Sequence, residues 1–408
     1  MRKRQWWNHR LIRNVSEPNW EAASKLGVHD RMLIRAGSRM LLQGNEDELV
    51  NMSSYSYLGL DEDARILSGA IAGLQSARVL NSSLSRIRMR LQLLDEAEGL
   101  LSDLFGADTG TVASCSAAAW SLLPLMASGL ITGGEPPVMV FDAHAHFCLQ
   151  SLKAACADET EVVTIRHNDV ERLEALCRKG GDVVYVADSV YSTGGSVAPM
   201  EDLIRLQAEY GLFVVFDEAH GTSVAGGNGE GFALSALGGI NERTFVVTSL
   251  NKGFGASGGA ILFGPRGDGR VRNIVARHGG PFLWSQRVNT AGLGAIKASV
   301  AIHAGSELAK LQSRLRSNIQ LFDTLVPNTG GANSELPVRT LRIGAEDLAV
   351  KVAARFQSVG FYVEPDFFPV VPRAEAGLRI RVRANMSRED IASFSAVLPE
   401  VLSGVPTL

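Results

Sequence analysis

The chain has 408 residues, of which 46% are hydrophobic and 20% are charged, as in ordinary globular proteins. A chain of this length exceeds what one hydrophobic core usually serves, so we expect two domains. The net charge of −3 gives no general attraction to nucleic acid or to an anionic membrane, and the apolar runs are too short to span a bilayer. We therefore expect no nucleic-acid partner and no membrane partner.

The first forty residues differ from the rest, because they hold nine Lys/Arg and only three acidic residues, and Trp6, Trp7 and Trp20 lie among them. Residues 1–60 are expected to form an arm and a linking strand. In one interpretation the arm packs its tryptophans on the body or on a second subunit. In the other it is a docking surface for an acidic partner.

The four cysteines show no paired spacing, which favours free thiols in a reducing compartment over a disulfide framework. The start of the chain is basic, but no apolar segment typical of a secretory signal follows it. Together these features predict a cytoplasmic protein.

Residues 61–290 are expected to form a large domain. Helical patterns cover 61–80 and 86–105, and beyond them strands alternate with helices. The expected strands are 111–113, 138–141, 162–165, 183–187, 212–216 and 244–250, and the helices between them are 116–127, 147–155, 170–178 and 199–210. The strands are near-continuous apolar runs, which indicates a mostly parallel sheet with helices on both faces. The run 259–263 follows too soon for a crossover helix, so we expect it to be antiparallel.

Residues 291–408 are expected to form a smaller α+β domain. It would start with one long helix from 291 to about 325. Strands at 338–341, 360–363 and 378–382, a helix at 345–358 and a last helix from 388 complete it.

Lys252 follows an apolar strand and precedes four glycines within seven residues. An unpaired ammonium group is costly to bury, so a lysine at a strand end is often used chemically, as an amine or as an imine with an aldehyde cofactor. The alternative is a lysine on a surface loop. The glycines match G-x-G-x-x-G, but a strand follows instead of a helix, so we do not expect a dinucleotide site.

Asp217 and His220 follow another apolar strand, in the run Phe216-Asp217-Glu218-Ala219-His220. Ligands of open α/β sheets bind beyond the carboxyl ends of the strands. A buried aspartate there needs a cationic partner, which a protonated pyridine nitrogen supplies. The alternative is an aspartate that caps a helix.

Two further strand ends carry candidate residues. His144 and His146 form an H-x-H pair, which is either a pair of metal ligands or the source of a ring that lies flat on an aromatic cofactor. Since no further ligand has a suitable spacing, we predict no metal site. Cys115 and Ser116 begin a helix rich in small residues, where backbone N–H groups can bind a phosphate. Cys115 as a nucleophile is the competing interpretation.

Taken together, these motifs resemble the α-oxoamine synthase family of fold-type I pyridoxal-phosphate (PLP) enzymes, over roughly residues 46–400. The likeness is carried by residues 57–60, 188–195 with 198–199, 217–221, 252–255 with 258–259, and 378–381. Residues 190–199 are also similar to the α-hydroxyketone autoinducer synthase branch. The resemblance implies a PLP transferase fold with a mostly parallel sheet in the large domain and a smaller C-terminal α+β domain.

The resemblance also implies residue roles. Lys252 would bind PLP as an imine and later remove the α-proton of the substrate, and Asp217 would pair with the ring nitrogen. His146 would stack on the ring, and His220 would bond its phenolate oxygen. The ring would also be bordered by Asp188 and Ser192, and its phosphate would be held by Cys115 and Ser116 amides, the Ser249 hydroxyl and Ser285 of a second subunit.

Arg381 would bind the amino-acid carboxylate, a task that suits a bidentate guanidinium group. Arg379 and Arg383 share its strand face and are the fallback. Tyr55 stands where the family usually has an asparagine that helps to hold this carboxylate. This departure bears on the substrate and leaves the cofactor chemistry intact.

The implied reaction is the decarboxylative Claisen condensation of an amino acid with an acyl thioester, on coenzyme A or a carrier protein, to give an α-aminoketone. A homodimer is also implied, because Ser285 would act across an interface. One alternative is another PLP reaction on this fold, such as transamination. A second is a non-catalytic partner subunit, against which the retention of Lys252, Asp217, His146 and His220 argues.

Overall fold

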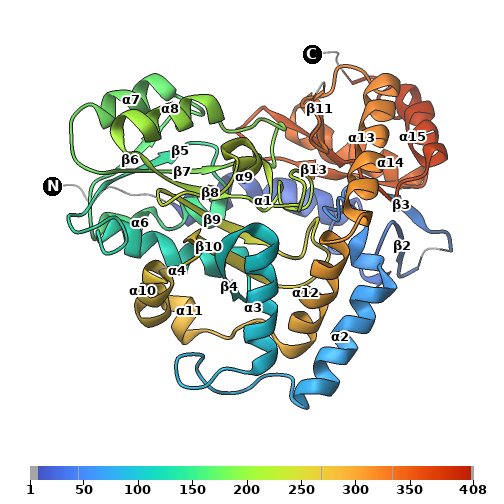
Figure 1. Cartoon of the computed structure of the whole chain (residues 1–408). Coiled ribbons are helices and arrows are strands. Elements are labelled where there is room, and N and C mark those ends of the chain that lie inside the picture. Colours follow the sequence, from blue (N-terminus) through green and yellow to red (C-terminus); the bar gives the residue numbers. More distant parts are fainter. Residues whose placement is uncertain (1–7, 45, 268, 333, 406–408) are drawn as a thin grey trace. The chain divides into compact units, whose positions relative to one another are not determined.

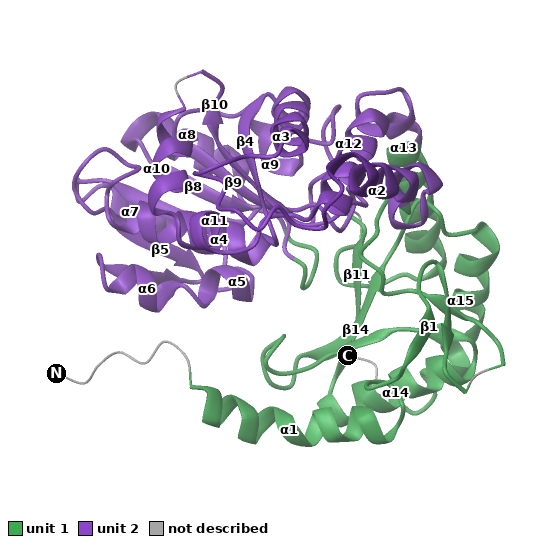
Figure 2. Ribbon diagram, turned by 90° about the horizontal axis from the view of Figure 1, so that it is seen from below, with its two compact units in different colours: residues 1–59, 192–196, 311–408 green, residues 60–191, 197–310 purple. Residues whose placement is uncertain are grey.

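The computed structural model describes residues 8–44, 46–267, 269–332 and 334–405. The chain forms two compact units, coloured separately in Figure 2. Unit 1 comprises residues 1–59, 192–196 and 311–408, and unit 2 comprises residues 60–191 and 197–310. The domain limits expected at residues 60 and 290 stay predictions.

Unit 2 is built on a seven-stranded sheet with the order β4-β10-β9-β8-β7-β5-β6 (Figure 1). Its strands are β4 (Ala107–Val112), β5 (Val138–Asp142), β6 (Val162–Ile165), β7 (Val183–Asp188), β8 (Phe213–Asp217), β9 (Thr244–Ser249) and β10 (Gly259–Pro265). The neighbouring strands β9, β8, β7, β5 and β6 pair in parallel. Strand β10 is antiparallel to both β9 and β4. The mostly parallel sheet and the antiparallel β10 were both predicted, and both predictions are confirmed.

The helices of unit 2 are η1 (Leu60–Glu62), α2 (Ala64–Ala77), α3 (Gln92–Phe105), α4 (Cys115–Ala127), α5 (Phe147–Gln150), α6 (Lys153–Ala157), α7 (Val170–Cys177), α8 (Met200–Tyr210), α9 (Phe232–Leu237), α10 (Arg270–His278), α11 (Gly280–Trp284) and α12 (Thr290–His303). One core cluster joins Leu101 of α3, Leu206 of α8 and Ile296 of α12 to strand residues such as Phe216. Val215 points to the opposite face of the sheet and is also buried. Burial on both faces explains why the strands are uninterrupted apolar runs.

Three predicted helices differ in the structure. The helix expected over 86–105 begins only at Gln92, because Arg86 is held in the interior by the buried carboxylate of Glu98. The helix expected over 147–155 is divided into α5 and α6. The long helix expected from 291 is interrupted after Ala304, where Gly305 closes a tight turn onto the carbonyl of Ile302.

Unit 1 contains two small sheets, with the orders β1-β2-β3-β12 and β11-β14-β13. Its elements are α1 (His9–Lys25), β1 (Leu33–Arg35), β2 (Arg39–Leu42), β3 (Leu49–Asn51), β11 (Val338–Gly344), α14 (Glu346–Ser358), β12 (Phe361–Tyr362), β13 (Glu364–Asp366), β14 (Ala376–Arg381) and α15 (Arg388–Val401), together with most of α13 (Glu307–Leu325). The smaller α+β part was predicted, but the helix α1 in the basic arm was not.

The arm is partly described. Trp20 lies on α1 with its ring edge-on to Phe367 at 4.8 Å between centroids, and Asn19 donates a hydrogen bond to Glu346. Trp20 therefore packs on its own unit, as the first interpretation of the arm expects. Trp6 and Trp7 lie outside the described residues. Among the described helices, none is long and apolar enough to cross a membrane.

Candidate active site

Polar residues gather at one edge of the seven-stranded sheet. Parallel strands present their carboxyl ends at the same edge, and these ends are Asp142 on β5, Asp188 on β7, Asp217 on β8 and Ser249 on β9. Strand β4 runs in the same direction, since β10 is antiparallel to both of its neighbours, so the start of α4 belongs to this edge as well. The topology alone thus brings together residues far apart in the sequence.

Lys252 lies in the loop between β9 and β10. Its Nζ is 2.8 Å from Nε2 of the buried His220, which follows β8. The loop backbone is closed by hydrogen bonds from Leu250 N to Gly258 O at 2.9 Å and from Ala256 N to Leu250 O at 2.8 Å. Lys252 is half-buried and engaged with a histidine, so it is not a lysine on a freely exposed loop.

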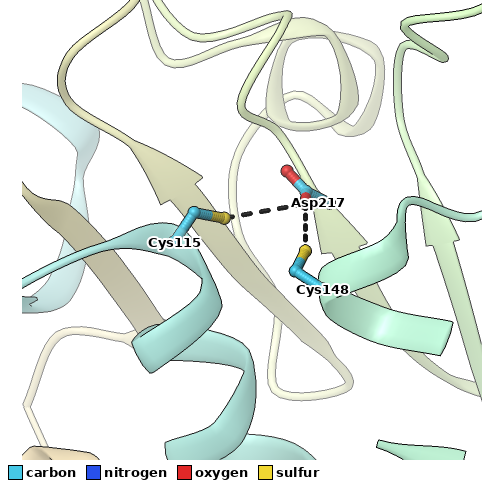
Figure 3. A group of neighbouring side chains, drawn as sticks. All are labelled: Cys115, Cys148 and Asp217. Atoms are coloured by element: carbon cyan, nitrogen blue, oxygen red, sulfur yellow. Dashed lines mark hydrogen bonds between the residues drawn. The ribbon is translucent and has the colours of Figure 1, made fainter. Parts of the chain in front are cut away.

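Asp217 is 4% exposed and has an unusual set of partners (Figure 3). Its Oδ1 accepts a hydrogen bond from Ala219 N at 2.9 Å. This local contact resembles the one expected if Asp217 capped a helix. Its Oδ2 lies 3.2 Å from Sγ of Cys148 and 3.6 Å from Sγ of Cys115. Thiols are weak donors, so the buried carboxylate has room for a stronger cationic partner.

Asp188 ends the neighbouring strand and pairs in register with Asp217. Its Oδ1 accepts a hydrogen bond from the backbone N–H of His146 at 2.9 Å. Burial, and then the negative charge of Asp217, raise the pKa of Asp188 well above its ordinary value. Two buried carboxylates at adjacent strand ends make this edge suitable for a positively charged group.

The two histidines of the H-x-H pair have different surroundings. The ring of His144 stacks on His167 with 4.3 Å between centroids, whereas Nδ1 of His146 accepts from Cys148 N at 3.3 Å at the start of α5. His146 is exposed, as a residue that covers a ligand would be. The one group of three close metal-ligand atoms within the described part of the chain does not include either histidine.

The predicted phosphate-binding residues are placed as follows. Cys115 and the exposed Ser116 form the first turn of α4, whose cap Ser114 accepts from Ala117 N at 3.1 Å. Ser249 is buried and donates to Asn251. The N–H groups of a helix's first turn have no partner within the helix, so this turn can bind an anion.

Ser285 caps the end of α11 and is exposed. It lines a cavity of about 620 Å³ together with Trp120, Pro281 and Trp284. Its expected role, which needs a second copy of the chain, stays a prediction.

The predicted substrate-binding residues belong to unit 1, as does Ser192. Arg379 is buried and bound through Nε to Asp366 at 2.6 Å, with a second bond that makes the pair bidentate. Nη1 of Arg381 donates to Glu364 at 2.9 Å, and its guanidinium lies 5.8 Å from the ring centroid of Tyr55. Nε of Arg381 is buried and makes no hydrogen bond to any described residue. Arg381 therefore keeps donor capacity that Arg379 has already used.

Arg383, the other fallback, lies just beyond β14 and is 1% exposed. It donates through Nη2 to the carbonyl of Asn51 at 2.6 Å. This contact joins the segment after β14 to the last residue of β3.

Sequence reasoning missed two residues of this region. Cys148 faces Asp217, and its position two residues after His146 was the available signal. Glu218 is fully buried and accepts from Phe232 N and Ala233 N at 2.7 and 3.0 Å, so it ties down the glycine-rich loop after β8. Burial raises the pKa of Glu218 to about 7.

Known proteins resemble this chain in both sequence and fold. The 8-amino-7-oxononanoate synthase of Mycolicibacterium gilvum is 28% identical over 360 residues, which cover 87% of this chain and 90% of that protein. A serine palmitoyltransferase variant from S. paucimobilis, solved with PLP and myriocin bound, has a TM-score of 0.82 at 18% identity and covers 97% of this chain and 99% of its own. The 8-amino-7-oxononanoate synthase of Francisella tularensis has a TM-score of 0.70 at 16% identity, with coverages of 87% and 98%.

The two solved structures show the fold, and the expected fold-type I PLP-transferase architecture is confirmed. A family model described as aminotransferase class I and II matches residues 47–398. The match covers both units and every predicted site residue. This chain belongs to the aminotransferase class I and II family.

Proposed function

We propose that this chain is a PLP-dependent acyltransferase of the α-oxoamine synthase type. It condenses an amino acid with an acyl thioester, releases carbon dioxide and forms an α-aminoketone. The family match and the relative named 8-amino-7-oxononanoate synthase support this function. The observation that carries it is the contact of Lys252 with His220, in which Nζ of Lys252 lies 2.8 Å from Nε2 of the histidine. The same unit holds the buried Asp217, whose carboxylate accepts from one backbone N–H and otherwise contacts two thiols.

The residues at the sheet edge fit PLP. An aldehyde needs an amine, a ring nitrogen that carries a proton needs a buried carboxylate, and a phosphate needs N–H donors at a helix start. Lys252, Asp217 and the first turn of α4 offer these three groups within one unit. When bound, PLP supplies an electron-poor ring that stabilises the electron pair left on the α-carbon of the amino acid.

The chain's own residues would bind and orient the reactants. Lys252 would hold the cofactor through its amine, and the same amine would accept the α-proton of the substrate. His220 is in hydrogen-bond contact with Nζ of Lys252 and can orient that amine. The carboxylate of Asp217 would keep the ring nitrogen of PLP protonated, and the imidazole of His146 would cover the ring. Asp188 holds the backbone of His146, so it positions that imidazole.

Arg381 is the proposed ligand of the substrate carboxylate. Its Nε is buried without a hydrogen bond to the described residues, and an unmade hydrogen bond of a charged group is costly. A carboxylate bound there would satisfy it. Tyr55 and Ser192 are the proposed neighbours of the substrate, and Arg379, already paired with Asp366, has a structural role instead.

We further propose a homodimer in which Ser285 reaches the phosphate site of the second subunit. The acyl donor is a thioester of coenzyme A or of a carrier protein. The four cysteines are unpaired, which supports a cytoplasmic location.

A second candidate is transamination, which the name of the matching family model favours. The two reactions differ in their products. A transaminase converts the amino acid to an oxo acid without a thioester, whereas the condensation requires the thioester and releases carbon dioxide.

The test uses the purified protein with a panel of amino acids and acyl thioesters. We expect the absorbance of PLP joined to the protein as an imine. This absorbance should be lost in Lys252→Ala and kept in Lys179→Ala, a control at an exposed lysine. We also expect carbon dioxide release that requires both substrates, and mass analysis then identifies the aminoketone. Oxo-acid formation without thioester and without carbon dioxide would overturn the proposal in favour of transamination.

A further inference from the structure

Three metal-ligating side chains meet at the sheet edge. They are Cys115 from α4, Cys148 from α5 and Asp217 from β8, and their ligand atoms all lie within 4.8 Å of one another (Figure 3). Cys148 and Asp217 are buried, whereas Cys115 is partly exposed and offers access from solvent. The other two cysteines, Cys156 and Cys177, are buried elsewhere and belong to no such group of described residues.

The distances suit a tetrahedral cation. Bonds of about 2.3 Å to sulfur and about 2.0 Å to oxygen, at a tetrahedral angle, separate a sulfur and an oxygen ligand by about 3.5 Å. The observed Sγ–Oδ2 distances are 3.2 Å for Cys148 and 3.6 Å for Cys115. The two sulfur atoms need a separation of about 3.8 Å. They already lie within 4.8 Å, so at most a small side-chain movement is required.

The charges also favour a cation. Asp217 is buried, and the buried carboxyl group of Asp188 ends the neighbouring strand in register with it. The amine of Lys252 lies near enough to act electrostatically on both Asp188 and Cys115. The two carboxyl groups and the two thiols can each lose a proton when a cation binds, so they can supply enough negative charge for a divalent ion.

We propose that the cofactor-free protein binds one soft divalent cation, such as Zn²⁺, through Sγ of Cys115, Sγ of Cys148 and a carboxylate oxygen of Asp217. Water completes the tetrahedron, and each thiol gives up its proton to the solvent on binding. Asp217 is also the proposed partner of the PLP ring nitrogen, so the cation and PLP exclude each other. Only this exclusion rests on the proposed function. The site would make the empty enzyme sensitive to zinc and the loaded enzyme resistant to it.

Hydrogen bonds from the two thiols to the carboxylate could by themselves account for the distances, so the test must identify the ligands directly. The full-length protein freed of PLP, kept reduced by a phosphine, is titrated with Zn²⁺ by calorimetry and with Co²⁺ by absorbance. We expect one equivalent of either metal and a thiolate-to-cobalt charge-transfer band. Cys115→Ser and Cys148→Ser should each weaken Zn²⁺ binding at least about 100-fold and reduce the band.

Cys156→Ser is the matched control, because Cys156 is buried as Cys148 is but lies outside the cluster, and this variant should bind Zn²⁺ as the wild type does. Circular dichroism verifies that each variant is folded. Equal affinity in all variants, or binding without the charge-transfer band, would overturn the metal site.

The exclusion is tested by repeating the titration after PLP is added. We expect the loaded protein to bind no Zn²⁺ at this site and Zn²⁺ to slow the uptake of PLP. Equal Zn²⁺ binding with and without PLP would overturn the exclusion. A protein that binds Zn²⁺ with the expected band but takes up no PLP would overturn the proposed function and leave the metal site standing.

Discussion

Strands β5 and β8 of unit 2 end alike, in Phe141-Asp142 and Phe216-Asp217, and both aspartates are buried. Asp142 accepts hydrogen bonds from the backbone of His144 at 2.7 Å and of Asn168 at 2.8 Å. The hydroxyl of Tyr185 donates to it at 3.0 Å, and Nδ1 of His167 lies 3.1 Å away. These contacts use the acceptor capacity of the carboxylate fully.

Asp217 is the contrasting case, with one N–H donor and two thiols. Burial acts on Asp142 to raise its pKa, but the hydrogen bonds from His167 and the backbone outweigh burial and hold the pKa below its ordinary value. The comparison teaches that burial at a strand end does not identify a binding site. What makes Asp217 a candidate is a buried carboxylate that the fold has left short of strong partners.

The largest expected effect on activity follows from a change at Asp217. Asp217→Asn should lower kcat/KM for condensation by about 1,000-fold, because a neutral amide cannot hold a protonated ring nitrogen. The thermal midpoint should change little, since the lost partners are thiols. Steady-state release of carbon dioxide and thermal unfolding measure the two quantities. A variant that keeps more than a tenth of wild-type activity would contradict the contrast.

Asp142→Ala should lower the stability of the protein and leave its binding of PLP unchanged. It leaves several buried donors without an acceptor, so the free energy of unfolding should fall by about 3 kcal/mol. Urea unfolding measures the loss, and the PLP absorbance should persist under native conditions. Asp158→Ala, at an exposed position, is the control and should change stability by less than about 0.5 kcal/mol. Loss of PLP binding without loss of stability would show that Asp142 belongs to the site.

His303 is a buried base in which both ring nitrogens have hydrogen-bond partners, as the buried Asp142 has. It accepts from Ser223 at Nε2 and donates to the carbonyl of Ser299 from Nδ1, both at 2.8 Å. Burial lowers its pKa from 6.5 to about 4, so the native state holds it neutral.

The stabilisation from this shift is present above pH 6.5 and is lost as the pH falls from 6.5 towards 4, by up to about 3 kcal/mol. Urea unfolding at a series of pH values should show this slope in the wild type. His303→Gln should be less stable at neutral pH but should lose the slope. An unchanged slope in the variant would assign it to another group.

The smallest expected effect is on the KM for the amino acid, and it should differ between two arginines of β14. Arg381→Lys should raise the KM for the amino acid by about 10-fold, because a lysine cannot bind a carboxylate in bidentate fashion. Arg379→Lys should instead lower the thermal midpoint and leave this KM unchanged, since its partner is Asp366. Steady-state kinetics over a range of amino-acid concentrations distinguishes the two outcomes. The reverse result would exchange the roles of Arg379 and Arg381.

The sequence predicts the parallel sheet well because burial on both faces leaves a simple apolar pattern. It also points to Lys252, Asp217 and His220 as candidates, since a polar residue soon after an apolar strand is conspicuous, and the structure brings Lys252 into contact with His220. It does not separate Asp142 from Asp217, because their partners come from other strands and loops. Cys148 was missed for the same reason, and the break after Ala304 was missed because one glycine in a helical pattern is often tolerated.

The closed loop around Lys252 has a mechanical consequence. Hydrogen bonds at Leu250 and Ala256, and one from Gly255 N to the carbonyl of Lys252 at 3.1 Å, anchor the main chain on both sides of this residue. Any movement of the amine must then come from rotation about the bonds of its own aliphatic stem. The anchored backbone thus limits the positions that the amine can reach to those within the length of its four-carbon stem.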